Sequence, residues 1–458
     1  MDHCLTPWTR RVTFEQPSNS NTIADDNLLV EELNRLSVRE REKIYEEVHG
    51  VVAVIDETPE FVAEKIQAMR EEVAKIPRNK KKALDRAIFL CPSILRDEKL
   101  LLMFLRARMF DPVQAAFLMY KYYENKLQLF GESLLVKTIT LDDLTEQEIE
   151  MVRTGSIQLL SGREQAGRGI IFMTLCDYDV RDWRAFVRYL WYIIISGLES
   201  DEEFQKRGLV EVAHLYGTFR HSPSQLIEAF WRSKNIIHNW PFRVGGFHLC
   251  FDNPTFRAFL NGINAIVVRD RRLRERCHFG SPLEATYALL TFGMSTQDCF
   301  TPNEGIKSQQ YIEAFMTDRQ VKEAKIKESE MEFEKPTSRF ALYPNPNDVL
   351  MGRGKPFREW PGNIRLAKIV ALHALRYAEA TNERIDKTII AMQIVHMIEN
   401  DDAGRFLQRT EDGWEVVEDS VSKEKVSQAL RTEARALTNS KPAALTVNKR
   451  GPLKVSGP

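Results

Sequence analysis

The spacing of apolar residues predicts helices in the first part of the chain. Between residues 28 and 140 apolar side chains recur at intervals of three and four, as at Leu101, Phe104 and Leu105, which is the period of an amphipathic helix. Four prolines fall at or near the expected helix starts, where proline costs least: Pro59, Pro77, Pro92 and Pro112. We therefore expect a helical N-terminal region.

The spacing of apolar residues changes after about residue 155. Short apolar runs typical of strands occur at Ile170–Cys176, Leu209–Tyr216 and Phe247–Phe251. Longer helical stretches alternate with them at Trp183–Leu198, Pro223–Ile237 and Pro254–Val268. This alternation predicts an α/β fold in which crossover helices cover a sheet. Because both faces of the first strand are mostly apolar, each must be covered by helices or by a bound apolar molecule.

A charged helix separates this part from a second module. The run 318–335 mixes acidic and basic residues and ends at a proline, with two further prolines close behind. We assign residues 306–346 to this helix and a linker, and residues 347–437 to a small α+β module. The polar segments 1–27 and 438–458 are predicted to be disordered tails.

The composition is that of a folded protein without a strong overall charge. The 458 residues are 43% hydrophobic and 28% charged, and their net charge of −1 draws the chain to neither nucleic acid nor membranes. The six cysteines form no C-x-x-C pair, which suits a reducing compartment. No signal peptide is evident, and the most apolar run, Leu190–Leu198, is too short to span a bilayer. We expect a cytoplasmic protein.

Two local features stand out against this background. Glu211 and His214 interrupt an otherwise apolar strand, and each needs a polar partner, either in the protein or on a ligand. Because they are three residues apart, they should lie on opposite faces of that strand. The segment 269–276 holds five arginines and two acidic residues, a net charge of +3, which indicates an anion site or a solvated surface.

Five segments occur in the order in which a known family has them. They are LRARMFD (105–111), SGREQAGRGIIFMTL (161–175), RGLVEVAHLYG (207–217), NWPFRVGGFHLCFDNP (239–254) and RRLRERCHFGSPLEATYALL (271–290). Through them, residues 96–305 resemble the CRAL-TRIO lipid-binding family, which includes retinaldehyde-binding, tocopherol-transfer and phosphatidylinositol-transfer proteins. The resemblance implies the family's N-terminal lobe within residues 28–140 and its lipid-binding domain at 141–305.

The resemblance also implies a ligand site. It predicts a mixed sheet with crossover helices that enclose an apolar cavity, closed by a mobile helix matching residues 255–268. From the period alone, the apolar stripe on that helix is more typical of core packing, and it is the resemblance that favours contact with a ligand. The implied pocket residues are Phe172, Glu211, Ala213, His214, Phe247, Leu249, Phe256, Phe259, Leu260, Ile263 and Ile266. His214 stands where the family strand usually ends in aspartate, so the ligand need not be a familiar one.

Three arginines match positions at which family members contact phosphoinositide phosphates. They are Arg243, Arg272 and Arg276. Arginine suits this role because its planar guanidinium can donate two parallel hydrogen bonds to phosphate oxygens. The resemblance therefore predicts contact with phosphoinositides or with an anionic membrane surface.

The C-terminal module carries a second resemblance. The segments NPNDVLMGRGKPFREWPGNIRLAKIV (345–370) and GRFLQRTEDGWEVVEDSVSKEKVSQALR (404–431) are similar to an uncharacterised module recurrent in algal proteins, over about 345–435. Its first part is basic. We predict that Arg353, Lys355 and Arg365 contact a partner, either a nucleic acid or a protein.

Together these features predict a soluble lipid-binding or lipid-transfer protein rather than an enzyme. It would hold one hydrophobic molecule or phospholipid and dock transiently on anionic membranes. The alternative is a ligand-sensing scaffold or nuclear protein whose C-terminal module binds DNA or a protein partner. The sequence shows no catalytic motif and no Cys/His metal cluster. We therefore expect no catalytic residue, no metal and no cofactor other than a bound lipid.

Overall fold

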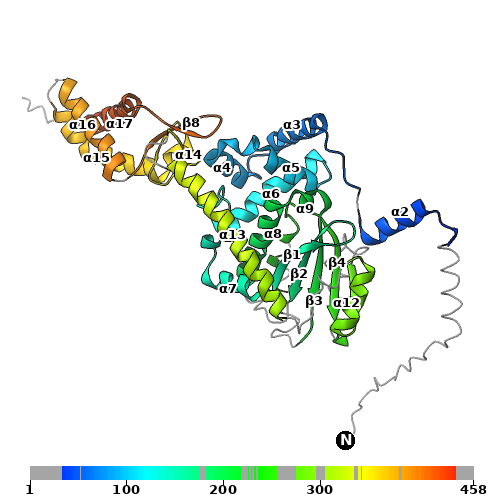
Figure 1. The fold of residues 1–458 in the computed structure, drawn as a ribbon. Helices are drawn as coiled ribbons and strands as arrows, with labels where there is room; N and C mark the ends of the chain where they lie inside the picture. The colour runs from blue at the N-terminus through cyan, green and yellow to red at the C-terminus, as the bar shows by residue number, and fades with distance from the viewer. Residues whose placement is uncertain are drawn as a thin grey trace, which may run out of the picture.

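The computed structural model shows a helical lobe, a mixed sheet and a smaller C-terminal module (Figure 1). It describes residues 34–51, 53–174, 182–217, 225, 228, 232–233, 236–254, 275–294, 305–334, 339–341, 343–380, 384–401 and 403–439. The predicted α/β class, with a helical N-terminal lobe and a small α+β module at its C-terminal end, is confirmed. The predicted tail 1–27 and the predicted closing helix 255–268 lie outside the described residues.

Helices predominate in the described chain from Val38 to Thr154, and some of them begin with a side-chain cap. They are α2 (Val38–His49), α3 (Pro59–Lys75), α4 (Lys82–Leu90), η1 (Pro92–Leu95), α5 (Glu98–Ala107), α6 (Pro112–Phe130), η2 (Leu141–Asp143) and α7 (Glu146–Thr154). Pro59 and Pro112 occupy the first turns of α3 and α6, as predicted, whereas Pro77 lies ahead of α4. Thr58 and Asp111 accept hydrogen bonds from backbone N–H groups of these first turns, which fixes where the two helices begin.

The larger sheet mixes antiparallel and parallel pairing. Its strands within the described residues are β1 (Ile157–Arg163), β2 (Gly169–Thr174), β3 (Leu209–His214), β4 (Val244–Phe251) and β5 (Glu275–Phe279), side by side in that order. β1 is antiparallel to β2, and the later neighbours are parallel. The predicted strand segments coincide with β2, β3 and β4. The sequence did not reveal β1 and β5, because polar residues interrupt their apolar runs.

Each face of this sheet packs against a different helix. The flanking helices are α8 (Trp183–Ser200), α9 (Glu202–Arg207) and α12 (Pro282–Thr291). Ile171 and Leu209 share one apolar core with Tyr189 of α8, and we call this side the α8 face. Val212 shares another core with Leu289 of α12, and we call that side the α12 face. The two-sided apolar pattern of the strands is thus largely matched by helices.

The LRARMFD segment connects the lobe to the sheet domain. Met109 and Phe110 have φ of 52° and 59°, a left-handed conformation that residues other than glycine rarely adopt, and they reverse the chain between α5 and α6. Arg106, just before them, is buried and donates hydrogen bonds to Glu57 Oε1 and to Gln205 Oε1 of α9, both at 2.9 Å. The LRARMFD segment thus forms a turn within the lobe and also connects the lobe to α9.

A long helix leads from the sheet domain to the C-terminal module. This helix, α13 (Gly305–Glu334), passes β1 and α8 and approaches the module, as Figure 1 shows. The module contains β6 (Phe340–Ala341), β7 (Val349–Met351), α14 (Lys355–Arg358), α15 (Pro361–Glu379), α16 (Arg384–His396), the π-helix η5 (Met397–Asp401), β8 (Phe406–Arg409), β9 (Trp414–Val416) and α17 (Asp419–Asn439). Its described strands form a sheet in the order β6-β9-β8-β7.

Aromatic packing joins the module to the N-terminal lobe. Trp414 is fully buried, and its Nε1 donates a hydrogen bond of 2.9 Å to the carbonyl oxygen of Leu90 at the end of α4. Its ring lies 5.6 Å from that of Phe89, centroid to centroid, and Phe357 packs on the same phenylalanine at 5.2 Å. Both contacts are edge-to-face, a favoured geometry for aromatic pairs. Apolar burial therefore holds the two parts together.

We expect Trp414→Ala to weaken this junction. Removing a buried tryptophan from an apolar core lowers the free energy of unfolding by about 3–5 kcal/mol, because the lost packing leaves a cavity. Urea unfolding followed by circular dichroism measures the change. Leu372→Ala is the matched control, since Leu372 on α15 is 81% exposed. Equal urea midpoints for the two variants would show that Trp414 does not join the parts.

Candidate functional site

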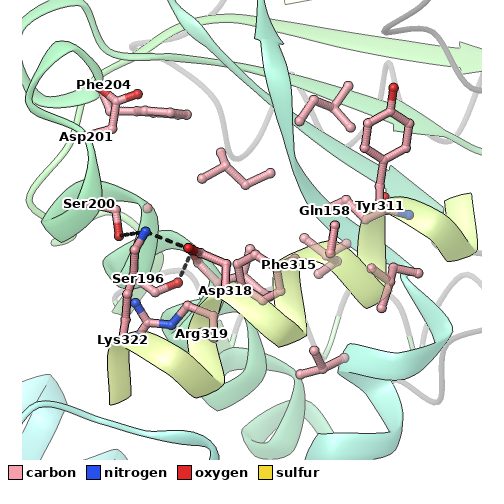
Figure 2. A pocket seen from close by; sticks show the side chains of 18 residues that line it. Gln158, Ser196, Ser200, Asp201, Phe204, Tyr311, Phe315, Asp318, Arg319 and Lys322 are labelled. Carbon is pink, nitrogen blue, oxygen red and sulfur yellow. Dashed lines mark hydrogen bonds and ion pairs between the residues drawn. The ribbon is translucent and has the colours of Figure 1, made fainter. Parts of the chain in front are cut away.

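A cavity of about 380 Å³ lies between β1, α8 and α13 (Figure 2). Its apolar walls are formed by Val152, Ile157, Leu159, Leu160, Ile193, Phe204, Ile312 and Phe315. Its polar lining residues are Gln158, Ser196, Ser200, Asp201, Tyr311, Asp318, Arg319 and Lys322. The volume is within the range of about 300–1,000 Å³ that is usual for small-molecule pockets, and so is the combination of apolar walls with a few polar groups.

Two glycines let the elements around the cavity approach closely. Gly197 lies on α8, where an added Cβ would come within 2.2 Å of Leu159 on β1. Gly155 ends α7 with a φ of +64°, and an added Cβ there would lie 2.0 Å from Ile312 on α13. A larger residue at either position would force the end of the Leu159 or Ile312 side chain, each of which lines the cavity, to move. The dimensions of the cavity therefore depend on these positions.

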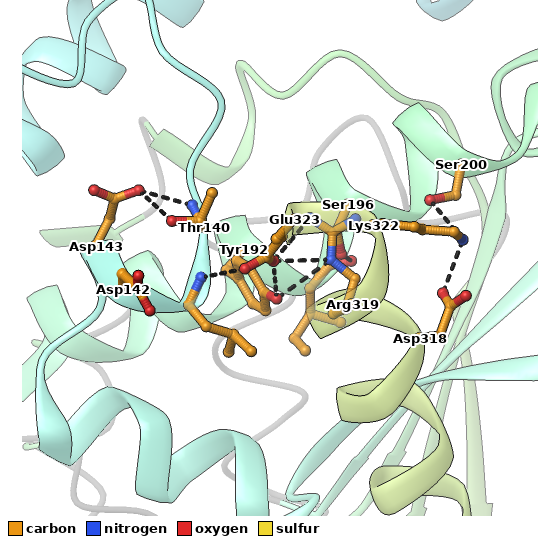
Figure 3. Close-up of polar contacts among 12 residues, drawn as sticks. Thr140, Asp142, Asp143, Tyr192, Ser196, Ser200, Asp318, Arg319, Lys322 and Glu323 are labelled. Carbon is orange, nitrogen blue, oxygen red and sulfur yellow. Dashed lines mark hydrogen bonds and ion pairs between the residues drawn. The ribbon is translucent and has the colours of Figure 1, made fainter. Parts of the chain in front are cut away.

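A buried polar network closes one end of the cavity (Figure 3). Glu323 is 2% exposed; its Oε1 accepts a hydrogen bond from the Tyr192 hydroxyl at 2.6 Å, and its Oε2 accepts one from the backbone N–H of Leu141 at 2.8 Å. Arg319 Nε donates to the same Oε1 at 3.2 Å and to the Tyr192 oxygen at 3.3 Å. Burial lowers the pKa of Arg319, but its interactions with Tyr192 and Glu323 outweigh burial and leave that pKa raised.

Ion pairs surround this end of the cavity. Lys322 Nζ lies 2.8 Å from Asp318 Oδ2 and 3.5 Å from the Ser200 hydroxyl. Asp201 pairs with Arg163 and also caps α9. Ser196 and Lys322 gather here with Arg319, whereas Gln158 and Tyr311 lie toward the opposite end (Figure 2). The site thus has apolar walls and polar side chains toward both ends, with Arg319 and Lys322 at one of them.

The predicted pocket residues that the structure describes are not among those that line this cavity. Glu211, Ala213, Phe247 and Leu249 lie in register on the α8 face, whereas Phe172 and His214 lie on the α12 face. Glu211 and His214 are thus on opposite faces, as predicted. The structure does not bring these six residues together, because parallel pairing places alternate residues of every strand on opposite sides. The other five predicted residues lie outside the described part of the chain: Phe256, Phe259, Leu260, Ile263 and Ile266.

The α12 face contains buried histidines. His214 is 2% exposed, its ring packs between Phe172 and Tyr216, and neither ring nitrogen has a hydrogen-bond partner among the described residues. Burial lowers its pKa to about 4. His248 Nδ1 lies 2.9 Å from His278 Nε2, and burial, with the neighbouring imidazole, lowers the pKa of His248 to about 3. These rings are therefore neutral near pH 7.

The predicted phosphate-binding arginines do not form one site. Arg243 donates a hydrogen bond of 2.7 Å to the sulfur of Met109 and another to the carbonyl oxygen of Lys206, so it faces the lobe. Arg276 is the second residue of β5. Its guanidinium lies over the ring of Phe292, 5.9 Å from the centroid, near the α12 face. Arg272 lies outside the described residues.

The motif of the C-terminal module proves largely structural. Asp348 is fully buried, and its carboxylate accepts hydrogen bonds from the backbone N–H of Asn345 at 2.7 Å and from the guanidinium of Arg405 at 3.0 Å. Its carbonyl oxygen accepts a hydrogen bond from Trp360 Nε1 at 2.8 Å. Asn363 both donates to and accepts from the backbone of Leu350, at 2.9 and 2.7 Å. These contacts hold β7 against α15.

The predicted partner-binding residues of the module lie near its surface. Arg353 and Lys355 are exposed, and Lys355 lies 3.7 Å from Glu359. Arg365 is half-buried and donates a hydrogen bond of 3.3 Å to Asn347 Oδ1. They remain a prediction.

The sequence did not reveal the α13 contribution to the cavity. Ile312, Phe315 and Arg319 follow each other at spacings of three and four, as on one helix face. The alternating charges of the following residues pointed instead to a solvated linker helix. The apolar spacing of Ile312 and Phe315 was visible in the sequence, but it covers fewer residues than the charged run 318–335 that follows it.

One family model and one solved structure resemble parts of this chain. Residues 348–432 match the family model described as a domain of unknown function (DUF6824), which confirms a recurrent module from β7 into α17. Among solved structures, the crystal structure of Sfh5 aligns with a TM-score of 0.36 and 12% sequence identity, over 58% of this chain and 100% of that chain. No curated protein matches the chain significantly.

Neither a membrane-spanning helix nor a metal-binding cluster occurs among the described residues. None of the helices placed in this structure combines the length and hydrophobicity that crossing a bilayer requires. No group of three or more histidine, cysteine, aspartate or glutamate side chains within the described ranges could hold a metal ion.

The buried histidines predict a pH-dependent stability. In the unfolded chain His214 takes up a proton below about pH 6.5, whereas in the folded chain it does so only near pH 4. Stability is therefore full above pH 6.5 and is lost as the pH falls toward 4, by about 3 kcal/mol for this residue. His214→Phe removes that contribution and suits the aromatic neighbours. Urea unfolding at pH 7.5 and 4.5 tests this; an equal loss in both proteins would contradict it.

Proposed function

We propose that the chain binds one hydrophobic or amphipathic molecule of lipid type in the cavity between β1, α8 and α13. The observation that carries this proposal is the cavity itself, about 380 Å³ in volume, with mostly apolar walls and a cluster of polar side chains around Arg319. A lipid has the same division, since an apolar body carries one polar group. Removing its apolar surface from water contributes about 25 cal/mol per Å², which makes such walls an affinity source.

The sequence resemblance to the CRAL-TRIO family points to the same class of ligand. The resemblance rests on ordered segments, and the cavity rests on the packing of α13, so the two lines of support are independent. Binding without chemical conversion is part of the proposal. Docking on an anionic membrane, a cytoplasmic location and lipid transfer between membranes stay predictions from the sequence.

Ligand sensing is a second candidate function, and α13 favours it. This helix lines the cavity through Ile312, Phe315 and Arg319, and farther along it packs against β6 of the C-terminal module. A molecule that displaced α13 would therefore act directly on an element that contacts the module. Binding of DNA or a protein by that module stays a prediction.

Native mass spectrometry of the purified chain tests the binding proposal. We expect a bound lipid after purification, or after incubation with phosphatidylcholine vesicles and reisolation. Ala314→Trp places a large ring at the cavity and should reduce the loaded fraction about tenfold, because the added ring occupies ligand volume. Val321→Trp, on an exposed face of the same helix, is the matched control. A chain that carries no lipid and takes none from vesicles would overturn the proposal.

Hydrogen exchange tests the sensing candidate. With phosphatidylcholine vesicles as the lipid source, loading should slow exchange in α13 and also in α4 and β9, the elements joined through Trp414. The physical reason is that a better-packed α13 holds the module more firmly. If exchange slows in α13 alone, the cavity is occupied but sensing is excluded.

A further inference from the structure

A basic surface extends across the junction between the N-terminal lobe and the C-terminal module. We infer that this surface binds the phosphodiester backbone of a nucleic acid, and that the lobe and the module each supply part of it. The inference does not depend on the proposed lipid binding. It rests on exposed cations in two segments, on the contacts that bring these segments together, and on the lack of exposed large apolar side chains in the described residues around them.

Two short segments carry cations and no acidic residue. The turn 77–82 between α3 and α4 contains four cations, and the segment 352–358, which includes α14, contains three. Carboxylates of this region are already paired with other cations: Asp85 with Lys81 at 4.0 Å, Glu359 with Lys355 at 3.7 Å, and Glu132 with Arg86. The remaining cations of the two segments are exposed and form no ion pair with a described residue: Arg78, Lys80, Lys82, Arg353 and Arg358.

Contacts across the junction place the two segments side by side. On α4, Lys82, Arg86 and Phe89 follow each other at spacings of four and three, so they share one helix face. That face meets the module, because the Arg86 guanidinium lies 5.3 Å from the centroid of the Trp360 ring and Phe357 of α14 packs on Phe89. Figure 1 shows α14 beside α4. Lys82 therefore lies on the side of α4 that α14 covers.

Both segments are held in place by the surrounding structure. Lys81 Nζ donates a hydrogen bond of 2.6 Å to the carbonyl oxygen of Val73, which ties the turn to α3. In the module, an added Cβ at Gly352 would lie 2.3 Å from the Phe357 ring, so the backbone next to Arg353 lies against that ring. Binding to segments that are already ordered costs less conformational entropy than binding to flexible ones.

The chemistry of this surface suits a phosphate backbone better than a protein or a bilayer. None of the large apolar side chains in the described segments 77–90 and 349–363 is exposed. Protein interfaces bury an apolar core, and peripheral binding to a bilayer strengthens with the apolar area that enters it. A nucleic acid needs neither, because clustered cations release the counterions condensed on its phosphates. With a net charge of −1 on the whole chain, such binding depends on a local surface.

Fluorescence anisotropy on the full chain tests this inference, with a labelled DNA duplex and a labelled single-stranded RNA of equal length as probes. Lys80→Gln/Lys82→Gln removes two cations of the lobe, and Arg353→Gln/Arg358→Gln removes two of the module. We expect each double variant to weaken binding at low salt at least about tenfold. Each should also make the slope of log K against log salt shallower by about 2 for the duplex, because two phosphate contacts are lost.

A control of equal charge decides whether the position of the cations matters. Lys43→Gln/Arg435→Gln removes two exposed cations from α2 and from the C-terminal end of α17, and it should leave the affinity within about twofold. Tighter binding of one probe would support the inference and identify the form of nucleic acid. Circular dichroism spectra that match the unsubstituted protein establish that the variants fold.

Three results would overturn the inference. They are a lobe variant that binds as tightly as the control, no binding of either probe, and loss of binding to phosphatidylserine-containing vesicles in both double variants while nucleic-acid binding is unchanged. Lipid loading, measured separately by native mass spectrometry, reports on the cavity alone. Failure of this inference therefore leaves the proposed function untouched.

Discussion

The position of α13 depends on one buried carboxylate, that of Glu323. Its hydrogen-bond partners come from different elements: Leu141 in η2, Tyr192 in α8 and Arg319 in α13 itself. An isolated charge at this depth would cost several kcal/mol, so the network stabilises the fold only while all partners are in place. Because α13 forms one wall of the cavity, this interaction also sets the space that a ligand can occupy.

The sequence predicted the parts of the fold that periodicity controls. The strands β2, β3 and β4 and the helix α8 appear as predominantly apolar runs, so their positions could be assigned in advance. The residues that line the cavity could not be assigned in advance. They depend on which face of the sheet each side chain points to and on which helix covers that face. Phe172 and Glu211 illustrate the difficulty, since each is plausible in a pocket and the strand register puts them on opposite sides.

The C-terminal module shows a related limit of motif reading. Asp348, Trp360 and Asn363 lie in the segment that marks the module, and their side chains hold β7 against α15. A recurring motif therefore identifies a fold here without identifying what that fold binds. The exposed Arg353 and Lys355 belong to the same segment, but neither takes part in these contacts.

Trp414 makes the N-terminal lobe and the C-terminal module depend on each other to bury their apolar side chains. Its ring and the side chains of Phe89 and Phe357 form a continuous apolar junction, and Arg409 adds a hydrogen bond of 3.0 Å to the carbonyl oxygen of Ile88. A fragment ending before the module would expose one half of this junction to water, and an isolated module would expose the other. The two fragments should consequently associate in solution. The lobe and the module therefore form one folding unit rather than two independent domains.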